Sequence, residues 1–141
     1  GDEPKENLLT KFKQLKNAVL LGSATFWEGV DVKGDSLSCV IIDKIPFASP
    51  KDPVMQGRMA HLAELGQSGF TELSLPSAVL ALKQGVGRLI RDINDKGILV
   101  IADPRLLARD YARAILASLP ALPITRDEQK VLQFIRDMAL E

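Results

Sequence analysis

Three short apolar runs constrain the fold of this 141-residue chain more than any other feature of its sequence. They occur in AVLLGSA, LSCVIID and GILVIAD, at residues 18–24, 37–43 and 97–103. Each is too short for an ordinary helix and is apolar almost without interruption, as in strands that are covered on both faces. Stretches with helical spacing separate the second run from the third, so the pattern predicts an α/β fold, a parallel sheet flanked by helices.

The expected helices lie around these runs at residues 4–17, 54–65, 76 to about 90 or 92, 103–119 and 125–140. Pro76 suits an early position of the third helix, and Thr125 and Glu128 have the spacing of a capping box in the last one. The segment IPFASPKDP, residues 45–53, contains three prolines and is expected to be an ordered loop or lid. Three strands are few for a parallel α/β domain, so we expect the chain to be part of a larger one.

The overall composition excludes several classes of protein. Lysine plus arginine and aspartate plus glutamate number 18 each, so the net charge indicates neither a nucleic-acid nor a membrane partner. The apolar runs are far shorter than the roughly 18 residues of a membrane span, and the chain shows no signal-peptide pattern, so a cytoplasmic protein is expected. Cys39 is the single cysteine, which leaves no spacing for a disulfide or a metal site and predicts a buried strand thiol.

The segment KQGVGRLIRD, residues 83–92, places two glycines in an expected helix, although glycine costs about 1 kcal/mol there relative to alanine. At about 100° per residue, Gln84, Arg88 and Arg91 share one face. The opposite face is apolar and consists of Val79, Leu82, Val86, Leu89 and Ile90. Guanidinium groups match phosphate oxygens, and the missing side chains of Gly85 and Gly87 would let an anionic ligand or a backbone approach. The alternative is a solvated helix face with surface ion pairs.

A second polar cluster, GSATFWEGVDVKGD at residues 22–35, follows the first apolar run. Ligands bind at strand ends in open parallel sheets. Gly29 permits unusual backbone angles, and the carboxylates of Glu28 and Asp31 can accept hydrogen bonds. The alternative is a polar turn with Phe26 and Trp27 packed beneath it.

Together the two segments resemble motifs V and VI of superfamily 2 helicases. ATFWEGVDVKGD is similar to motif V of the XPD-like branch, in particular of the DinG/YoaA type, and LKQGVGRLIRD matches the motif VI pattern Q-x-x-G-R-x-x-R. The stretches IDKIPFASPKDPV and GILVIADPRL extend the resemblance over nearly the whole chain, and FWEGVDV favours the YoaA side of the family.

The resemblance implies a partial RecA-like domain, in which residues 1–141 form the C-terminal part of the second motor domain of a longer DNA repair helicase. Arg91 would then be the arginine finger on the γ-phosphate of ATP, with Arg88 as its companion and Gln84 as a nearby polar group. The residues expected at the nucleotide are Gly29, Asp31, Glu28 and Gly87. Those expected on single-stranded DNA are Lys33, Lys51, Arg58, Trp27 and Phe47. The alternative is that Trp27 and Phe47 pack in the core and that the lysines are ordinary surface residues.

The chain contains neither a phosphate-binding loop nor a D-E-A-H-like box. The resemblance therefore implies that ATP and Mg²⁺ are bound mainly by a first motor domain outside this chain, and that a 4Fe-4S cluster belongs to the parent protein and not to this segment. Alone, this segment is expected to be inactive.

The alternative interpretation is a non-catalytic module that docks a protein partner, for instance a replication or repair protein, through the last helix. That helix carries an apolar stripe of Val131, Leu132, Ile135, Met138 and Ala139. Such a stripe more often covers the domain's own core, which is the expectation here.

Overall fold

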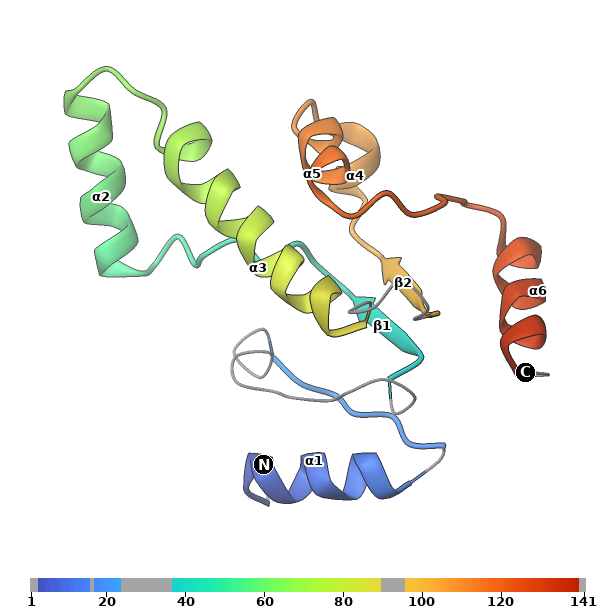
Figure 1. Cartoon of the computed structure of the whole chain (residues 1–141). Helices are drawn as coiled ribbons and strands as arrows, with labels where there is room; N and C mark the ends of the chain where they lie inside the picture. The colour runs from blue at the N-terminus through green and yellow to red at the C-terminus, as the bar shows by residue number, and fades with distance from the viewer. Residues whose placement is uncertain (1–2, 16, 24–36, 90–95, 140–141) are drawn as a thin grey trace.

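The computed structural model describes residues 3–15, 17–23, 37–89 and 96–139. Its elements are the helices α1 (Lys5–Gln14), α2 (Pro53–Glu64), α3 (Leu75–Leu89), α4 (Arg105–Ala108), α5 (Ala112–Ser118) and α6 (Glu128–Ala139), the π-helical turn η3 (Phe70–Ser74), and the strands β1 (Cys39–Ile42) and β2 (Ile98–Ile101) (Figure 1). This order of helices and strands confirms the predicted α/β class.

The sheet of the described residues has two strands. β1 and β2 pair in parallel from Cys39 opposite Ile98 to Ile42 opposite Ile101, which confirms the second and third predicted strands and their orientation. The first predicted strand is wrong within the described part, because residues 17–23 form no strand, and Val19 and Leu21 are 87% and 88% exposed. An apolar run becomes a strand only where a neighbouring strand satisfies its backbone, and this run pairs with neither β1 nor β2.

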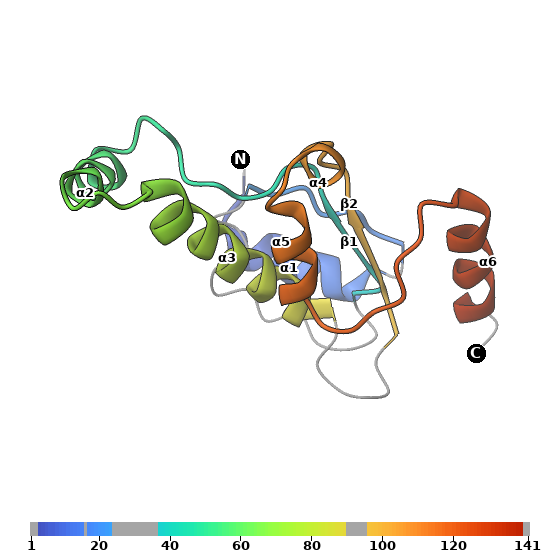
Figure 2. The ribbon, with the colours of Figure 1, turned by 90° about the horizontal axis from the view of Figure 1, so that it is seen from above.

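Only one face of the two-stranded sheet is covered by the described helices. α3 packs against both strands and against α5 (Figure 2). Ile42 is buried, whereas Ile41 is 68% exposed and Cys39 is also exposed. The predictions of a sheet covered on both faces and of a buried Cys39 are therefore wrong for this part of the chain, because alternate residues of β1 point away from α3.

The core forms where α3 lies on the sheet. Ala78, Leu82 and Val86 of α3 are fully buried and Leu89 nearly so, at the spacing of one helix face. Leu82 packs in one cluster with Ile42, Ile45 and Ile115. The predicted apolar face of this helix is confirmed for its described residues, and Ile90 lies outside them.

α2 begins and ends on local signals. The side chain of Asp52 accepts hydrogen bonds from the backbone N–H groups of Val54 (2.9 Å) and Met55 (3.1 Å), and Pro53 occupies the first helical position. Gly66, with a φ of 70°, ends the last turn. The prediction of a helix over residues 54–65 is confirmed, and the preceding proline-containing loop has no regular structure.

The predicted early position of Pro76 in this helix is confirmed, because α3 begins at Leu75, but the helical structure starts sooner than predicted, since η3 continues into α3 from Phe70. Proline has no N–H group and cannot donate to the carbonyl four residues earlier. The preceding residue, Leu75, instead donates its N–H to the carbonyl of Phe70, five residues back. The wider π-helical turn thus accommodates the proline at the start of the helix.

Two expectations about the C-terminal third are wrong. The helix predicted over residues 103–119 is divided into α4 and α5, because the backbone of Arg109 is extended. The capping box also fails: α6 begins at Glu128, so Asp127 caps it by accepting from the N–H of Gln129 (3.0 Å), while Thr125 accepts from Asp127 (3.1 Å).

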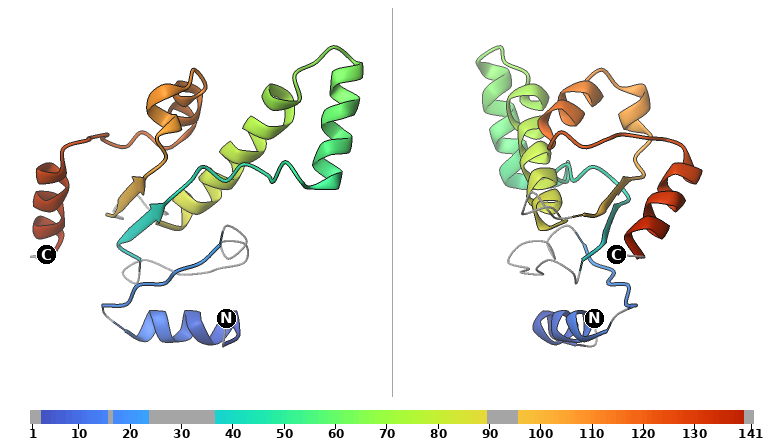
Figure 3. Two further views of the ribbon diagram at one scale, coloured as in Figure 1. Left: turned by 180° about the vertical axis from the view of Figure 1, so that it is seen from behind. Right: turned by 45° about the vertical axis from the view of Figure 1, so that its right-hand side comes forward.

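α6 stands apart from the other helices at the end of an irregular segment (Figure 3). Of the predicted stripe on α6, Leu132 and Ile135 are 37% and 45% exposed and Val131 and Met138 are half-buried, while the side chain of Ala139 is outside the described part. The expectation that this stripe covers the core of the domain is therefore wrong for the described residues, because the extended segment after α5 leads the helix away from α3 and the sheet.

Asp103 joins the chain segments that leave the two strands. Its carboxylate is 4% exposed and accepts hydrogen bonds from the backbone N–H groups of Ile45 (2.8 Å) and Arg105 (2.9 Å) and from the Nε of Arg105. The hydrogen bonds from Arg105 are the main reason why the pKa of Asp103 lies far below its usual range. The carboxylate is thus a charged clamp that fixes the start of the loop after β1.

We expect Leu82→Ala to lower the free energy of unfolding of the chain by about 2–5 kcal/mol, because it opens a cavity in the fully buried core. Urea unfolding followed by circular dichroism measures this loss. Leu80→Ala is the matched control on the same helix, since Leu80 is 59% exposed. Equal losses in the two variants would contradict the described packing of α3.

We expect Asp103→Asn to lower the free energy of unfolding by about 1–3 kcal/mol at neutral pH, because a neutral amide replaces a buried carboxylate that accepts several hydrogen bonds. The exposure of the partner Arg105 limits the loss, since solvent screens the ion pair. Because the pKa of Asp103 is lower in the folded chain than in the unfolded chain, the ionised carboxylate stabilises the fold above its unfolded pKa of about 4. This stabilisation is lost as the pH falls toward the folded pKa. The difference between wild type and variant should therefore shrink in unfolding experiments below about pH 4. The exposed Asp110→Asn variant serves as the control, and a pH-independent difference for Asp103→Asn would argue against the clamp.

Candidate functional site

The polar face of α3 is the first part of the candidate site. Gln84 is exposed and lies two residues, about half a turn, from each of the buried Leu82 and Val86, so it faces away from them. Gly87 is also exposed, and a Cβ added there would meet no atom within 4 Å, so open space adjoins this face. Gly85 is buried, which leaves only Gly87 on the open side. The backbone of Arg88 belongs to α3, but its side chain and all of Arg91 lie outside the described residues.

Nearly all of the second predicted cluster, residues 22–35, lies outside the described part of the chain; Gly22 and Ser23 are described, and both are exposed. Its candidate site residues are Trp27, Glu28, Gly29, Asp31 and Lys33, all within residues 24–36. Their proximity to Gln84 therefore stays a prediction.

Two of the basic residues predicted to bind DNA, Lys51 and Arg58, are exposed. Lys51 is in the turn before α2, where its backbone N–H donates to the Ser49 hydroxyl (3.2 Å), and Arg58 is on α2. α2 contacts the start of η3, since a Cβ on Gly69 would lie 3.0 Å from the Met59 side chain. Figure 1 shows α2 beside the N-terminal end of α3, with Gln84 toward the other end of that helix.

Phe47 lies in an aromatic cluster that sequence patterns did not indicate. Its ring centroid is 5.7 Å from that of Phe70 and 5.8 Å from that of Tyr111, and the Phe70 and Tyr111 centroids are 5.2 Å apart. The ring also packs against the hydrophobic core. The three residues come from the loop after β1, from η3 and from the turn before α5, so only the folded chain brings them together.

Arg105 covers this aromatic cluster. Its guanidinium carbon is 5.1 Å from the centroid of the Phe47 ring, within cation–π range. The Asp103 carboxylate raises the pKa of Arg105, chiefly through the hydrogen bonds between them, so the guanidinium remains charged. The sequence run DPR, residues 103–105, was the available signal for this pair, but nothing in it pointed to Phe47.

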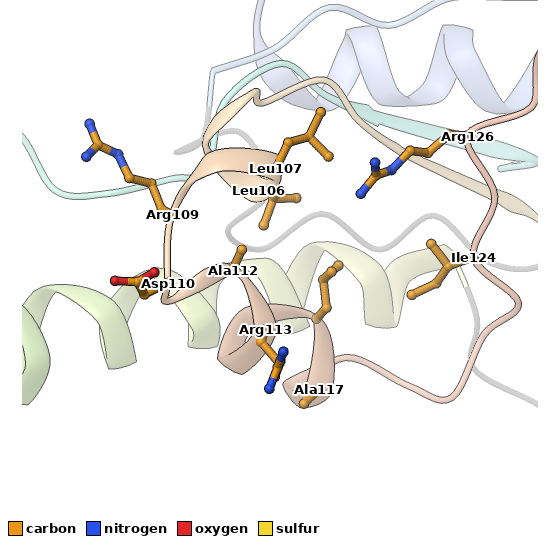
Figure 4. A pocket seen from close by; sticks show the side chains of 10 residues that line it. Leu106, Leu107, Arg109, Asp110, Ala112, Arg113, Ala117, Ile124 and Arg126 are labelled. Carbon is orange, nitrogen blue, oxygen red and sulfur yellow. The ribbon is translucent and has the colours of Figure 1, made fainter.

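A hollow of about 860 Å³ lies elsewhere, beside α4 and α5 (Figure 4). Leu106, Leu107 and Ile124 line it together with Arg109, Arg113 and Arg126. Within the described ranges no group of acidic, histidine or cysteine side chains is arranged to hold a metal ion, and no helix has the length and apolarity to cross a membrane.

Comparison with known proteins places these features in a family. Residues 1–122 match the helicase C-terminal domain. The chain is 52% identical over 135 residues to the ATP-dependent DNA helicase YoaA of Escherichia coli K12, covering 96% of this chain and 21% of that protein. It is 37% identical over 139 residues to the ATP-dependent helicase DinG of Mycobacterium tuberculosis H37Rv, covering 99% of this chain and 21% of that protein.

A third relative is named for a different activity: the 3'-5' exonuclease DinG of Bacillus subtilis 168 is 41% identical over 118 residues, 84% of this chain and 13% of that protein. The chain thus spans about a fifth or less of the length of these relatives. The identity to YoaA exceeds the identity to these two DinG proteins, as the FWEGVDV stretch indicated. The match over 122 residues shows that the chain belongs to the helicase C-terminal domain family, with relatives of the DinG/YoaA type.

Proposed function

We propose that this chain is the C-terminal part of the second RecA-like motor domain of an ATP-dependent DNA helicase that acts in DNA repair. In this role it supplies arginine side chains to ATP that is bound mainly by a first motor domain. It also forms part of the track for single-stranded DNA, and it is inactive without the remainder of the protein.

The observation that carries this proposal is the two-sided character of α3. One face is buried to completion at Leu82 and Val86, which fixes the helix on the sheet. The other presents Gln84 beside the open space at Gly87. A helix held rigidly by one face can place groups from its other face with the precision that phosphoryl transfer requires.

In this proposal Arg91 stabilises the charge that develops on the transferred phosphoryl group, while Arg88 and Gln84 position it. Gly29, Asp31, Glu28 and Gly87 line the nucleotide edge. Mg²⁺, when bound, neutralises phosphate charge, and its ligands belong to the first motor domain. A four-thiolate iron–sulfur cluster does not fit this chain, which has one cysteine, so the proposal assigns any such cluster to another part of the protein.

Single-stranded DNA would contact Lys33, Lys51, Arg58, Trp27 and Phe47, because basic side chains follow the backbone and aromatic rings stack on bases. The exposure of Lys51 and Arg58 supports this assignment. Phe47 is only partly buried, and Phe70 beside it is 39% exposed, so this ring cluster reaches the surface. We expect the protein to act in the bacterial cytoplasm.

The exposed stripe on α6 supports a second candidate function, the docking of a protein partner. Leu132 and Ile135 of this stripe remain accessible in the folded chain, and so does the neighbouring Phe134. In that case the helicase motifs would be inherited without a catalytic role. The next experiment separates the two candidates.

We expect Arg91→Ala in the full-length protein to lower ATP turnover with single-stranded DNA by about 10³-fold, because the transition state loses its arginine finger. ATP binding should be nearly retained, as measured by fluorescent nucleotide titration. Arg113→Ala on α5 is the control for loss of an exposed arginine. Unchanged turnover in Arg91→Ala would show that the polar face of α3 is ordinary solvated surface, and it would favour the partner-docking candidate.

We expect Gly87→Ala to stabilise the fold by up to about 1 kcal/mol and yet to lower ATP turnover, because alanine favours the helix but fills the space where the nucleotide would approach. Gly57→Ala is a matched control, since Gly57 is also an exposed helical glycine with no atom within 4 Å of an added Cβ. It should stabilise the protein similarly and leave turnover unchanged. Equal turnover in the two variants would contradict a nucleotide beside Gly87.

A further inference from the structure

The aromatic cluster of Phe47, Phe70 and Tyr111 connects the loop after β1, η3 and the turn before α5. The proposed function gives these three parts of the chain no common role. Each pair of ring centroids lies 5.2–5.8 Å apart, within the range of favourable aromatic contact. Phe47 belongs to the loop after β1, whereas Phe70 is the first residue of η3. A displacement of the Phe47 ring must therefore be accommodated by Phe70 or Tyr111.

Arg105 restricts the position of the Phe47 ring. Its Nε donates to both oxygens of Asp103, at 2.9 and 3.0 Å, so the plane of the guanidinium is fixed on a buried carboxylate. The same carboxylate holds the backbone N–H of Ile45, two residues before Phe47. One charged pair thus fixes both the start of the loop and the surface on which the Phe47 ring rests.

Phe70 lies at the opposite end of a continuous helical rod from the motif VI residues. η3 passes directly into α3, which ends at Leu89. At 1.5 Å per residue, Phe70 and Gln84 are separated by roughly 20 Å along the helix. The buried residues of α3 keep this rod on the sheet, and the π-helical turn at its start is the element in which a change of hydrogen-bond register is most accessible.

We propose that Arg105 and Phe70 are positioning residues that couple the Phe47 loop to the arginine-bearing end of α3. On this proposal, a base that contacts Phe47 shifts the aromatic cluster, and η3 and α3 transmit the shift toward the nucleotide. The proposal rests on the proposed function, because it requires DNA at Phe47 and ATP beside α3. Coupling of this kind requires a contiguous physical connection, which the cluster and the rod provide.

The test uses Phe70→Leu in the full-length protein, which keeps apolar volume but removes the ring. We measure ATP turnover without DNA and with saturating oligo-dT, the KM for ATP, and the melting temperature. The expected result is an unchanged DNA-independent turnover and KM, with DNA-stimulated turnover lowered by about fivefold or more, the lower end of coupling between sites. Phe70→Tyr should retain stimulation, and Arg105→Lys, which lacks the planar fork, should lose it.

Phe134→Leu on α6 is the matched control, because Phe134 is 41% exposed and Phe70 is 39% exposed. A parallel fall of DNA-independent and DNA-stimulated turnover in Phe70→Leu would show a merely structural role and overturn the inference. Unchanged stimulation would overturn it as well. If the wild-type protein shows no DNA-stimulated turnover, the proposed function fails too. If it does, and only Arg91→Ala impairs it, the inference about Phe70 and Arg105 fails alone.

Discussion

The hydrogen bonds and the ion pair of the Asp103 carboxylate are the interactions on which the rest of the structure depends. It is nearly inaccessible to solvent at the end of β2, and a buried charge is tolerated only when it is paired and hydrogen-bonded. Its partners come from both segments that leave the sheet, the backbone of Ile45 after β1 and the backbone and side chain of Arg105 at the start of α4. Because parallel strands end at the same edge of the sheet, one residue can form hydrogen bonds with both segments that follow them.

α3 also stabilises the sheet, through apolar packing, whereas Asp103 acts through charge and hydrogen bonds. A sheet of two short strands has little cohesion of its own, since two-stranded sheets are marginal in water. The buried face of α3 supplies the apolar contact that the strands need, with Leu82 in the same cluster as Ile42 and Ile115. The polar face of the same helix is then positioned as a consequence of folding.

The helices were predictable to the extent that local signals define them. The lysine-flanked apolar pattern of α1 and the Asp52–Pro53 start of α2 act within one or two turns, so the sequence alone contains them. The strands were predictable only in part: LSCVIID and GILVIAD pair, whereas the similar run at residues 18–23 does not. Apolarity specifies that a segment should be buried, but not which neighbour buries it. The exposed Cys39 and the break at Arg109 were missed for the same reason.

The candidate site divides in the same way. The order and spacing of Gln84, Arg88 and Arg91, together with the segment at residues 22–35, carried the helicase resemblance and predicted that these three residues share one helix face. Of the three side chains the structure describes that of Gln84, which is exposed. The family match bears out the resemblance. Only the tertiary structure decided that Phe47 meets Phe70 and Tyr111 under Arg105, and that the α6 stripe stays exposed. Such contacts join residues that are distant along the chain, and no local pattern determines which of many apolar and charged side chains will meet.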